Sequence, residues 1–463
     1  MTTHQPLPGF PDGFLWGVST SAFQIEGAQD EDGRGASSWD AFTRQPGRVK
    51  DGSDASVATG HYHRWPEDVA LLRDLGVGAY RFSVSWPRVL PTGSGKVNTA
   101  GLDFYDRLVD ALCSAGIEPV TTLFHWDTPL PLEEGGGWLA RDTAHRFADY
   151  ADLVAARLTD RVTHWITLNE PAELTLLGYG LGEHAPGRQL LFEALPAAHH
   201  QLLGHGLAVR ALRARGARSV GIANSHGPVW PLSGREEDTG AAQLYDLVTN
   251  RLFADPLLLG RYPDDGLAAM LPGPVADDLT VIGEPLDWYG VNYYQPTLVG
   301  APDPVGGAAE FAGIGMPEGL PFGIREIPGR ERTGFGWAVV PEGLAQTLRI
   351  LRDRYGAQLP PVMITENGCA YPEPAADTER IAFHDAHLRE LHAAIDDGAD
   401  VRGYFVWSLL DNFEWAEGYA QRFGLVHVDW TTLERTPKDS YRWLRDVLRD
   451  QRGRQPRGQR DGR

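Results

Sequence analysis

Eight short apolar runs, rich in β-branched and aromatic residues, are spread along the 463-residue chain and give the strongest indication of its fold. Segments with the spacing of amphipathic helices separate these runs. Strands that alternate with helices in this way predict a single (β/α)8 TIM barrel, an α/β fold with long loops over the carboxyl-terminal face of the barrel. The runs cover residues 13–19, 77–84, 118–126, 164–171, 219–227, 287–296, 361–368 and 401–409.

The main alternative fold is an open doubly wound sheet, which is expected to begin with a glycine-rich phosphate-binding loop. Neither G-x-G-x-x-G nor G-x-x-x-x-G-K occurs in the sequence, so we favour the closed barrel. We expect residues 1–450 to form one barrel domain. Residues 451–463 are rich in arginine and poor in apolar residues, which predicts a disordered tail rather than a nucleic-acid-binding patch.

The charge and the cysteine content limit the partners and the compartment. A formal net charge of −20 argues against nucleic acid and against an anionic membrane surface as partners. The two cysteines are too few for a disulfide framework. We see neither a signal peptide at the start nor an apolar stretch of membrane-spanning length. We therefore expect a cytoplasmic protein.

Polar and aromatic residues stand where several of the predicted strands end. Asn169 and Glu170 follow the fourth strand, and Glu366 ends the seventh. In a barrel of this kind the chemistry takes place at the carboxyl ends of the strands, so these residues predict a site there. Further candidates at the other strand ends are Gln24, Arg81, His125, Trp126, Asn292, Tyr294 and Trp407.

Glu170 and Glu366 are expected to face each other across the barrel mouth. Two carboxyl groups about 5–5.5 Å apart define a retaining glycosidase, whereas about 6.5–9.5 Å indicates inversion. Arg81 would keep a neighbouring carboxylate ionised, which suits a nucleophile. A second carboxyl group beside that negative charge, and partly desolvated, would have a raised pKa, which suits a general acid.

Motifs along nearly the whole chain resemble those of the β-glucosidases of glycoside hydrolase family 1. "TLNEP" resembles the acid/base motif of that family and "ITENG" its nucleophile motif, which places these roles on Glu170 and Glu366. The resemblance implies retaining hydrolysis of terminal β-D-glucosyl residues through a covalent glycosyl-enzyme, without a metal or another cofactor. The remaining motifs, in the expected order, are "FLWGVSTSAFQIEGA", "YRFSVSWPR", "FHWD", "GVNYY", "WSLLDNFEWAEGY" and "RTPKDSYRWL".

The same resemblance implies a sugar pocket. Asn169 would meet the 2-hydroxyl, while Gln24 and Glu414 would bind the 3-, 4- and 6-hydroxyls. Because this pair can serve either orientation of the 4-hydroxyl, we expect side activity on β-galactosides and β-fucosides. The implied substrate-binding residues are Gln24, His125, Trp126, Asn169, Tyr294, Trp337, Trp407, Glu414 and Trp415, with Arg81 and Asn292 in support.

Two features bear on the leaving group. The stretch after "NEP" is Ala172-Glu173-Leu174, where the family often has Trp and small residues, so the leaving-group side departs from the family pattern. Residues 297–336 are rich in Gly and Pro and lack clear periodicity, and we expect them to lie over the barrel mouth. The expected substrate is a β-glucoside or a cellooligosaccharide, and the sequence leaves the oligomeric state open.

Three other functions remain as alternatives. The first is a sugar-binding barrel without catalysis, which would require the loss of one carboxylate or of the residues around it. The second is a metal-dependent barrel enzyme. The third is a β-glycosidase that acts mainly as a transglycosylase, because the sequence does not show how water reaches the glycosyl-enzyme.

Overall fold

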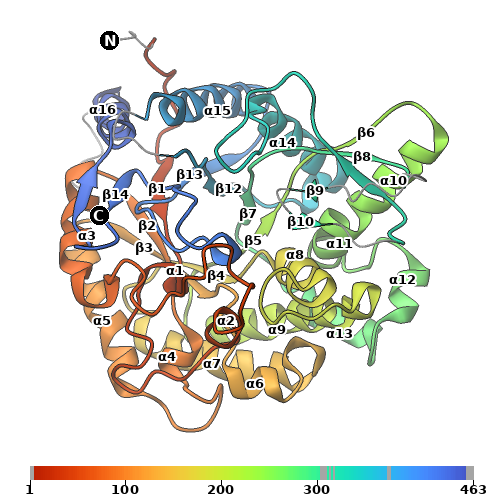
Figure 1. The fold of residues 1–463 in the computed structure, drawn as a ribbon, viewed down its shortest axis with the longest axis horizontal. Helices are drawn as coiled ribbons and strands as arrows, with labels where there is room; N and C mark the ends of the chain where they lie inside the picture. The colour runs from red at the N-terminus through yellow and green to blue at the C-terminus, as the bar shows by residue number, and fades with distance from the viewer. Residues whose placement is uncertain (1–4, 303–309, 312–313, 316–318, 373–376, 455–463) are drawn as a thin grey trace.

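In the computed structural model, which describes residues 5–302, 310–311, 314–315, 319–372 and 377–454, eight parallel strands close into a central barrel (Figure 1). The prediction of a (β/α)8 barrel is therefore confirmed. The strand order around the barrel is β1-β13-β12-β7-β5-β4-β3-β2. The strands are β1 Leu15–Ser19, β2 Ala79–Ser83, β3 Glu118–Phe124, β4 His164–Asn169, β5 Ser219–Ser225, β7 Tyr289–Asn292, β12 Val362–Asn367 and β13 Val401–Trp407.

The barrel strands are buried on both faces, which explains why they read as nearly continuous apolar runs. One cluster of buried side chains fills the inside of the barrel and includes Val120, Ile166, Met363 and Phe405. Gly17 on β1 has to be glycine, because a Cβ atom there would lie 2.3 Å from the ring of Phe405. The barrel is a packed core, and its chemistry is left to the strand ends.

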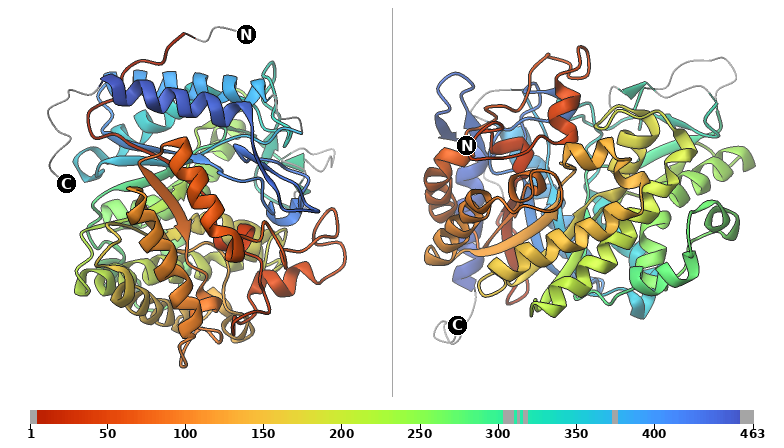
Figure 2. Two further views of the ribbon diagram at one scale, coloured as in Figure 1. Left: turned by 90° about the vertical axis from the view of Figure 1, so that its left-hand side faces the viewer. Right: turned by 90° about the horizontal axis from the view of Figure 1, so that it is seen from below.

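Helices surround the barrel on all sides (Figures 1 and 2). Helix α9 is buried along most of its length because it packs against α7 and lies close to β4. The main helices are α3 His61–Leu75, α5 Thr99–Ser114, α7 Asp142–Leu158, α9 Leu195–Ala214, α10 Glu236–Asp246, α11 Leu252–Leu259, α13 Val275–Ile282, α14 Pro341–Tyr355, α15 Thr378–Asp396 and α16 Asp439–Arg454.

Helix α16 continues to Arg454, so the first residues of the predicted tail are helical, and residues 455–463 lie outside the described residues. Gln451 explains this extension, since its side chain accepts a hydrogen bond from Phe10 N at 3.0 Å and donates one to Pro8 O at 2.8 Å. The N-terminal segment thus runs beside α16 (Figure 2). None of the helices in the described part of the chain is both long and apolar enough to cross a membrane.

Short strands lie outside the barrel, at its carboxyl-terminal face. Part of the stretch predicted to be irregular, 297–336, forms strands that join a small sheet in the order β11-β8-β6, which packs against α10. Residues 303–309, 312–313 and 316–318 of this stretch lie outside the described residues. The remaining strands are β6 Val229–Pro231, β8 Thr297–Gly300, β9 Glu310–Phe311, β10 Ile314–Gly315, β11 Gly323–Arg325, β14 Val426–Val428 and β15 Arg435–Pro437.

Short helical segments complete the loops. They are α1 Ala22–Ile25, α2 Ser38–Thr43, α4 Trp86–Val89, α6 Leu130–Glu134, η1 Gly137–Leu139, α8 Pro171–Glu173, η2 Leu174–Leu181, η3 Leu191–Ala194, η4 Leu247–Arg251, α12 Asp265–Met270, η5 Gly356–Gln358 and η6 Trp415–Glu417.

Candidate active site

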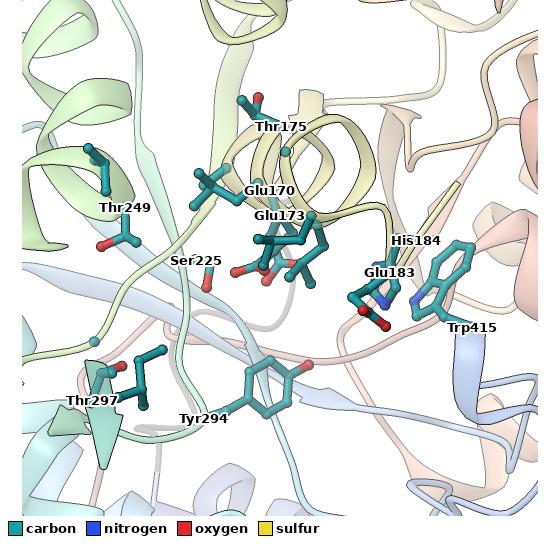
Figure 3. Close-up of a pocket in the computed structure, with 18 of the residues that line it drawn as sticks. Glu170, Glu173, Thr175, Glu183, His184, Ser225, Thr249, Tyr294, Thr297 and Trp415 are labelled. Atoms are coloured by element: carbon teal, nitrogen blue, oxygen red, sulfur yellow. The ribbon is translucent and has the colours of Figure 1, made fainter. Parts of the chain in front are cut away.

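A cavity of about 320 Å³ opens at the carboxyl ends of the barrel strands, and both predicted catalytic carboxyl groups line it. Figure 3 shows Glu170 and Tyr294 on opposite sides of this cavity. The predicted residues that line it are His125, Trp126, Glu170, Tyr294, Trp337, Glu366, Trp407, Glu414 and Trp415. The other predicted residues, Gln24, Arg81, Asn169 and Asn292, lie buried behind this lining and contact it.

Glu366 is the penultimate residue of β12, and Arg81 and Tyr294 both donate hydrogen bonds to its carboxyl group. Arg81 Nη1 lies 2.6 Å from its Oε1, and the Tyr294 hydroxyl donates to its Oε2 at 2.7 Å. Only 2% of Glu366 is exposed, and this burial raises its pKa, while Arg81, Tyr294 and Asn292 oppose the rise. The two donors fix the carboxyl group in one orientation and favour its ionised form, as a nucleophile requires.

Glu170 follows β4 in a left-handed backbone conformation, with φ of 45°, and Pro171 then begins α8. Asn169 Nδ2 donates to its carboxyl group at 3.3 Å, and a side-chain hydrogen bond from Asn292 acts to lower its pKa. Burial raises the pKa of Glu170 well above its usual range, and the charges of Glu366 and Glu173 raise it further. The group therefore keeps its proton at pH values where an ordinary glutamate is ionised, as a general acid must.

The Asn169 amide connects the two carboxyl groups. Its Oδ1 accepts hydrogen bonds from Arg81 Nη2 at 2.6 Å and from Asn292 Nδ2 at 3.0 Å. These two donors fix the orientation of the amide, so that Nδ2 donates to Glu170 and, at 3.1 Å, to His125 Nε2. A substitution at Asn169 would therefore disturb both carboxyl groups at once.

The same network sets the tautomer of His125. Because Nε2 accepts from Asn169, the hydrogen of the neutral ring lies on Nδ1, which is buried and has no hydrogen-bond partner among the described residues. Burial, and then the charge of Arg81, lower the pKa of His125 well below its usual value, so the ring stays neutral. The ring therefore lines the cavity without adding a charge to it.

Gln24 in α1, after β1, and Glu414, in the loop after β13, form a polar pair. Gln24 Nε2 lies 3.2 Å from Glu414 Oε2, and Gln24 is fully buried behind it. Burial, and next the charges of Glu366 and Glu417, raise the pKa of Glu414 to about 8. Burial and the nearby negative charges therefore favour the protonated form of Glu414.

Aromatic side chains form the rest of the sugar side of the cavity. His125 stacks on Trp407 with ring centroids 5.8 Å apart, and Trp126 contacts Trp415 at 4.7 Å. Trp126 and Trp415 both have a positive φ, of 75° and 51°. Non-glycine residues in this conformation are uncommon and concentrate at ligand sites. Trp337, which also lines the cavity, stacks on Phe335 with ring centroids 4.3 Å apart.

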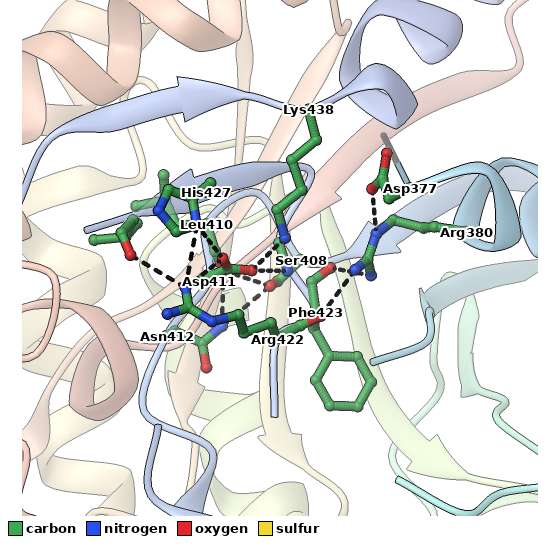
Figure 4. A network of polar contacts seen from close by, with 12 residues as sticks. Asp377, Arg380, Ser408, Leu410, Asp411, Asn412, Arg422, Phe423, His427 and Lys438 are labelled. Carbon is green, nitrogen blue, oxygen red and sulfur yellow. Dashed lines mark hydrogen bonds and ion pairs between the residues drawn. The ribbon is translucent and has the colours of Figure 1, made fainter. Parts of the chain in front are cut away.

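A buried ionic network supports the loop that carries Glu414 (Figure 4). Asp411 accepts hydrogen bonds from Lys438 Nζ at 2.7 Å and from Arg422 Nη1 at 3.0 Å. Burial acts to raise the pKa of Asp411, but Lys438 and His427 outweigh it and lower the pKa to about 2. The next residue, Asn412, accepts from Gln24 Nε2 at 3.0 Å, so the network reaches the sugar-binding pair.

The Asp411→Asn variant is expected to lower the free energy of unfolding at pH 7 by about 3–5 kcal/mol, because it leaves Lys438 buried without its anion. Denaturant unfolding measures this. Since the folded pKa of Asp411 is lowered, its stabilising contribution is present above about pH 4 and is lost as the pH falls towards 2. The control is Asp439→Asn, which removes an exposed ion pair with Arg442 and should change stability by less than about 1 kcal/mol. Equal effects of both variants would contradict this assignment.

The leaving-group side of the cavity holds residues that the sequence-based prediction missed. Glu173 lines the cavity one helical turn after Glu170, and Ser225 at the end of β5 lies beside it. The i, i+3 spacing from Glu170 could have indicated this position, since residues three apart share a helix face. Among the described residues, the cavity included, no group of three or more His, Cys, Asp or Glu residues is placed to hold a metal ion.

A (β/α)8 barrel with two buried carboxyl groups at its mouth, one held by Arg81 and the other with a raised pKa, is the architecture of a glycoside hydrolase. The model of glycosyl hydrolase family 1 matches residues 8–453. The chain belongs to this family, as its motifs indicated.

Several characterised proteins resemble the chain over nearly its whole length. It is 48% identical over 451 residues to thermostable β-glucosidase B of Thermobispora bispora, covering 95% of this chain and 90% of that protein. It is 44% identical to the bifunctional β-D-glucosidase/β-D-fucosidase of Bifidobacterium breve, covering 95% and 98%. The structure of the family 1 β-glucosidase from Thermotoga maritima superimposes with a TM-score of 0.90 at 41% identity, covering 96% and 99%.

Proposed function

We propose that the chain is a retaining β-glucosidase that removes terminal β-D-glucosyl residues, with Glu366 as nucleophile and Glu170 as acid/base. One observation carries the assignment of roles. Arg81 and Tyr294 hold Glu366, whereas Glu170 lacks a cationic partner among the described residues and has the more strongly raised pKa. The family, and relatives that are named β-glucosidases, support the reaction class.

The first half of the reaction forms a glycosyl-enzyme. A carboxylate oxygen of Glu366 attacks the anomeric carbon, the glycosidic bond breaks, and the electron pair goes to the leaving oxygen. Glu170 gives its proton to that oxygen, so the leaving group departs as a neutral alcohol. In the second half Glu170, now ionised, takes a proton from water, the water oxygen attacks the anomeric carbon, and Glu366 is released with net retention.

The sugar-binding residues would act around this pair. We infer that Asn169 binds the 2-hydroxyl next to both carboxyl groups, where hydrogen bonds strengthen in the transition state. Glu414, with Gln24 behind it, would bind the 4- and 6-hydroxyls, and Trp407 would lie under the ring. The relative that is named as both a β-glucosidase and a β-fucosidase supports the proposed side activity on β-fucosides; the activity on β-galactosides stays a prediction.

The decisive test is hydrolysis of an aryl β-D-glucoside followed by proton NMR. We expect β-glucose to appear before mutarotation, because two inversions give retention. Initial release of α-glucose would exclude the glycosyl-enzyme, and absence of hydrolysis would favour a sugar-binding barrel. Activity should survive dialysis against a chelator, whereas its loss would favour the metal-dependent alternative. With a high concentration of a second sugar as acceptor, the ratio of hydrolysis to transfer can be read in the same experiment.

The pH dependence of kcat/KM should be bell-shaped, with an acidic limb set by Glu366 and an alkaline limb set by Glu170. Activity needs Glu366 ionised, so it is lost as the pH falls below the pKa of Glu366. It needs Glu170 protonated, so it is lost as the pH rises above the pKa of Glu170, which burial, Glu366 and Glu173 raise and Asn292 and Arg81 lower. Burial, and next the charges of Glu366 and Glu417, raise the pKa of Glu414 to about 8, and Glu414→Gln removes that ionisation. If the alkaline limb persists in Glu414→Gln, it belongs to Glu170. If the limb vanishes in this variant, the assignment of the alkaline limb to Glu170 is contradicted.

Three further sequence-based conclusions stay predictions. They are a single catalytic domain over residues 1–450, a cytoplasmic location and independence from cofactors. A β-glucoside is the substrate that the site supports.

A further inference from the structure

The leaving-group part of the cavity has a mostly apolar wall. The side chains that form it come from η2, η3 and the small β11-β8-β6 sheet with the neighbouring helical segment, and they include Leu177, Leu181, Phe192, Val248 and Phe322. Phe192 and its neighbour Leu191 are each 40% exposed at the cavity, although large apolar side chains are normally covered. Exposed apolar groups around a cavity mark a surface that receives an apolar ligand.

The backbone of this wall is irregular where it follows the acid/base residue. Residues Leu174–Leu181 form a π-helix, and Leu191 has a positive φ of 49°. Both features are uncommon in ordinary helices and loops, and they concentrate at functional sites. Here they direct Leu177 and Leu181 towards the cavity next to the catalytic pair.

The carboxyl group of Glu173 lies among these apolar side chains. It lies in the first turn after Glu170, and its backbone N–H donates to Glu170 O at 3.1 Å. Figure 3 shows the side chains of Glu170 and Glu173 pointing into the same cavity, with Ser225 next to Glu173. Ser225 supplies a hydrogen bond, but no arginine, lysine or histidine forms an ion pair with Glu173 in the described part of the chain.

We propose that Glu173 is a specificity-determining residue of the leaving-group site, and that it accepts a hydrogen bond from a hydroxyl group on a leaving group with an apolar body. The proposal deepens the proposed function and rests on it. The substrates it favours are β-glucosides of hydroxylated aromatic or alicyclic alcohols, rather than cellooligosaccharides, whose second sugar would place many hydroxyl groups against the apolar wall.

The physical reason is the desolvation of a polar group. A carboxyl group beside apolar side chains loses water when the leaving group enters, and it needs a donor in exchange. A leaving group without a hydroxyl leaves Glu173 unsatisfied, whereas one with a hydroxyl restores the bond. Burial raises the pKa of Glu173, which is consistent with incomplete compensation in the free enzyme.

The experiment compares two substrates that differ by one hydroxyl group, phenyl and 4-hydroxyphenyl β-D-glucoside, with 3-hydroxyphenyl β-D-glucoside to vary its position. Their leaving groups have similar acidity, so the ratio of kcat/KM reports recognition. We expect the kcat/KM of the wild type for whichever hydroxyphenyl β-D-glucoside is cleaved faster to exceed that for phenyl β-D-glucoside by about 10-fold. This factor corresponds to one hydrogen bond to a charged group. In Glu173→Leu the ratio should fall to about 1, and Glu173→Gln should be intermediate, since its amide oxygen still accepts.

The matched control is Glu193→Gln, which removes an exposed carboxylate from η3 near the cavity but outside its lining. It should leave the substrate ratio unchanged. A merely structural role of Glu173 would lower kcat/KM for all substrates equally and leave the ratio at its wild-type value, which would overturn the proposal. So would a wild-type ratio of 1 for both hydroxylated substrates.

A second comparison tests the apolar body. Octyl β-D-glucoside and cellobiose both release aliphatic alcohols, so the intrinsic difficulty of bond cleavage is similar. Higher kcat/KM for octyl β-D-glucoside supports the proposal. Higher kcat/KM for cellobiose, together with a selective loss on cellobiose in Glu173→Leu, would assign Glu173 to a second sugar instead and overturn the proposal. Failure to cleave any of these glucosides would contradict the proposed function itself, which is a distinct outcome.

Discussion

The Glu366→Ala variant is expected to lower kcat on aryl β-glucosides by about 10⁴-fold or more, because it removes the carboxylate that Arg81 and Tyr294 orient for attack on the anomeric carbon. Losses of this size follow removal of the nucleophile from other enzymes that use covalent catalysis. A good leaving group should not help, since the missing step is the attack on the anomeric carbon. Steady-state kinetics with aryl glucosides of different leaving-group acidity measure both effects.

Added azide distinguishes the loss of a nucleophile from general damage. In Glu366→Ala a small anion can enter the space left by the carboxyl group and displace the leaving group with one inversion. Any glycosyl azide formed should therefore be the α-anomer, and recovery of a β-linked azide would contradict the assignment of Glu366. Because the substitution also leaves Arg81 without its carboxylate, Glu366→Gln serves as the control that keeps the shape of the site. Both variants should be inactive without azide and retain wild-type circular dichroism.

The barrel could be predicted from the sequence because each strand is buried on both faces and leaves an apolar run of its own. The small β11-β8-β6 sheet could not, since its strands are only three or four residues long and lie among glycines and prolines. Its position depends on packing against α10, a contact between segments far apart in the chain. The end of α16 is similar, because its helical extension depends on the contact between Gln451 and the N-terminal segment.

The candidate site was easier to predict than its electrostatics. Sequence motifs indicated Glu170 and Glu366, and the structure brings both to one cavity together with Tyr294 and Trp407. The protonation of Glu414 could not be read from its motif, because the shift of its pKa to about 8 depends on burial and on the distant Glu366. Whether Glu173 would face the cavity likewise depended on how the helix begins after Glu170.

The Glu170→Ala variant is expected to show an opposite pattern to that of Glu366→Ala. Without its general acid, the enzyme should lose about 10²–10⁴-fold in kcat/KM on alkyl glucosides and cellobiose, whose leaving groups need a proton. Aryl glucosides with acidic leaving groups, such as dinitrophenyl, should form the glycosyl-enzyme at nearly the wild-type rate. Hydrolysis of the intermediate then becomes rate-limiting because no base activates water, so a burst of phenol should precede slow turnover.

Azide should accelerate that slow turnover, because an anion needs no general base and attacks the glycosyl-enzyme directly. The product should be β-glucosyl azide, since two inversions restore the original configuration, and NMR identifies it. Glu170→Gln is the matched control, which removes the same acid but leaves less room for azide, so its rescue should be weaker. Since both variants remove the group whose raised pKa sets the alkaline limb of kcat/KM, that limb should be lost in both. Rescue of both Glu170→Ala and Glu366→Ala with the same azide anomer, or of neither, would contradict the division of roles between the two carboxyl groups.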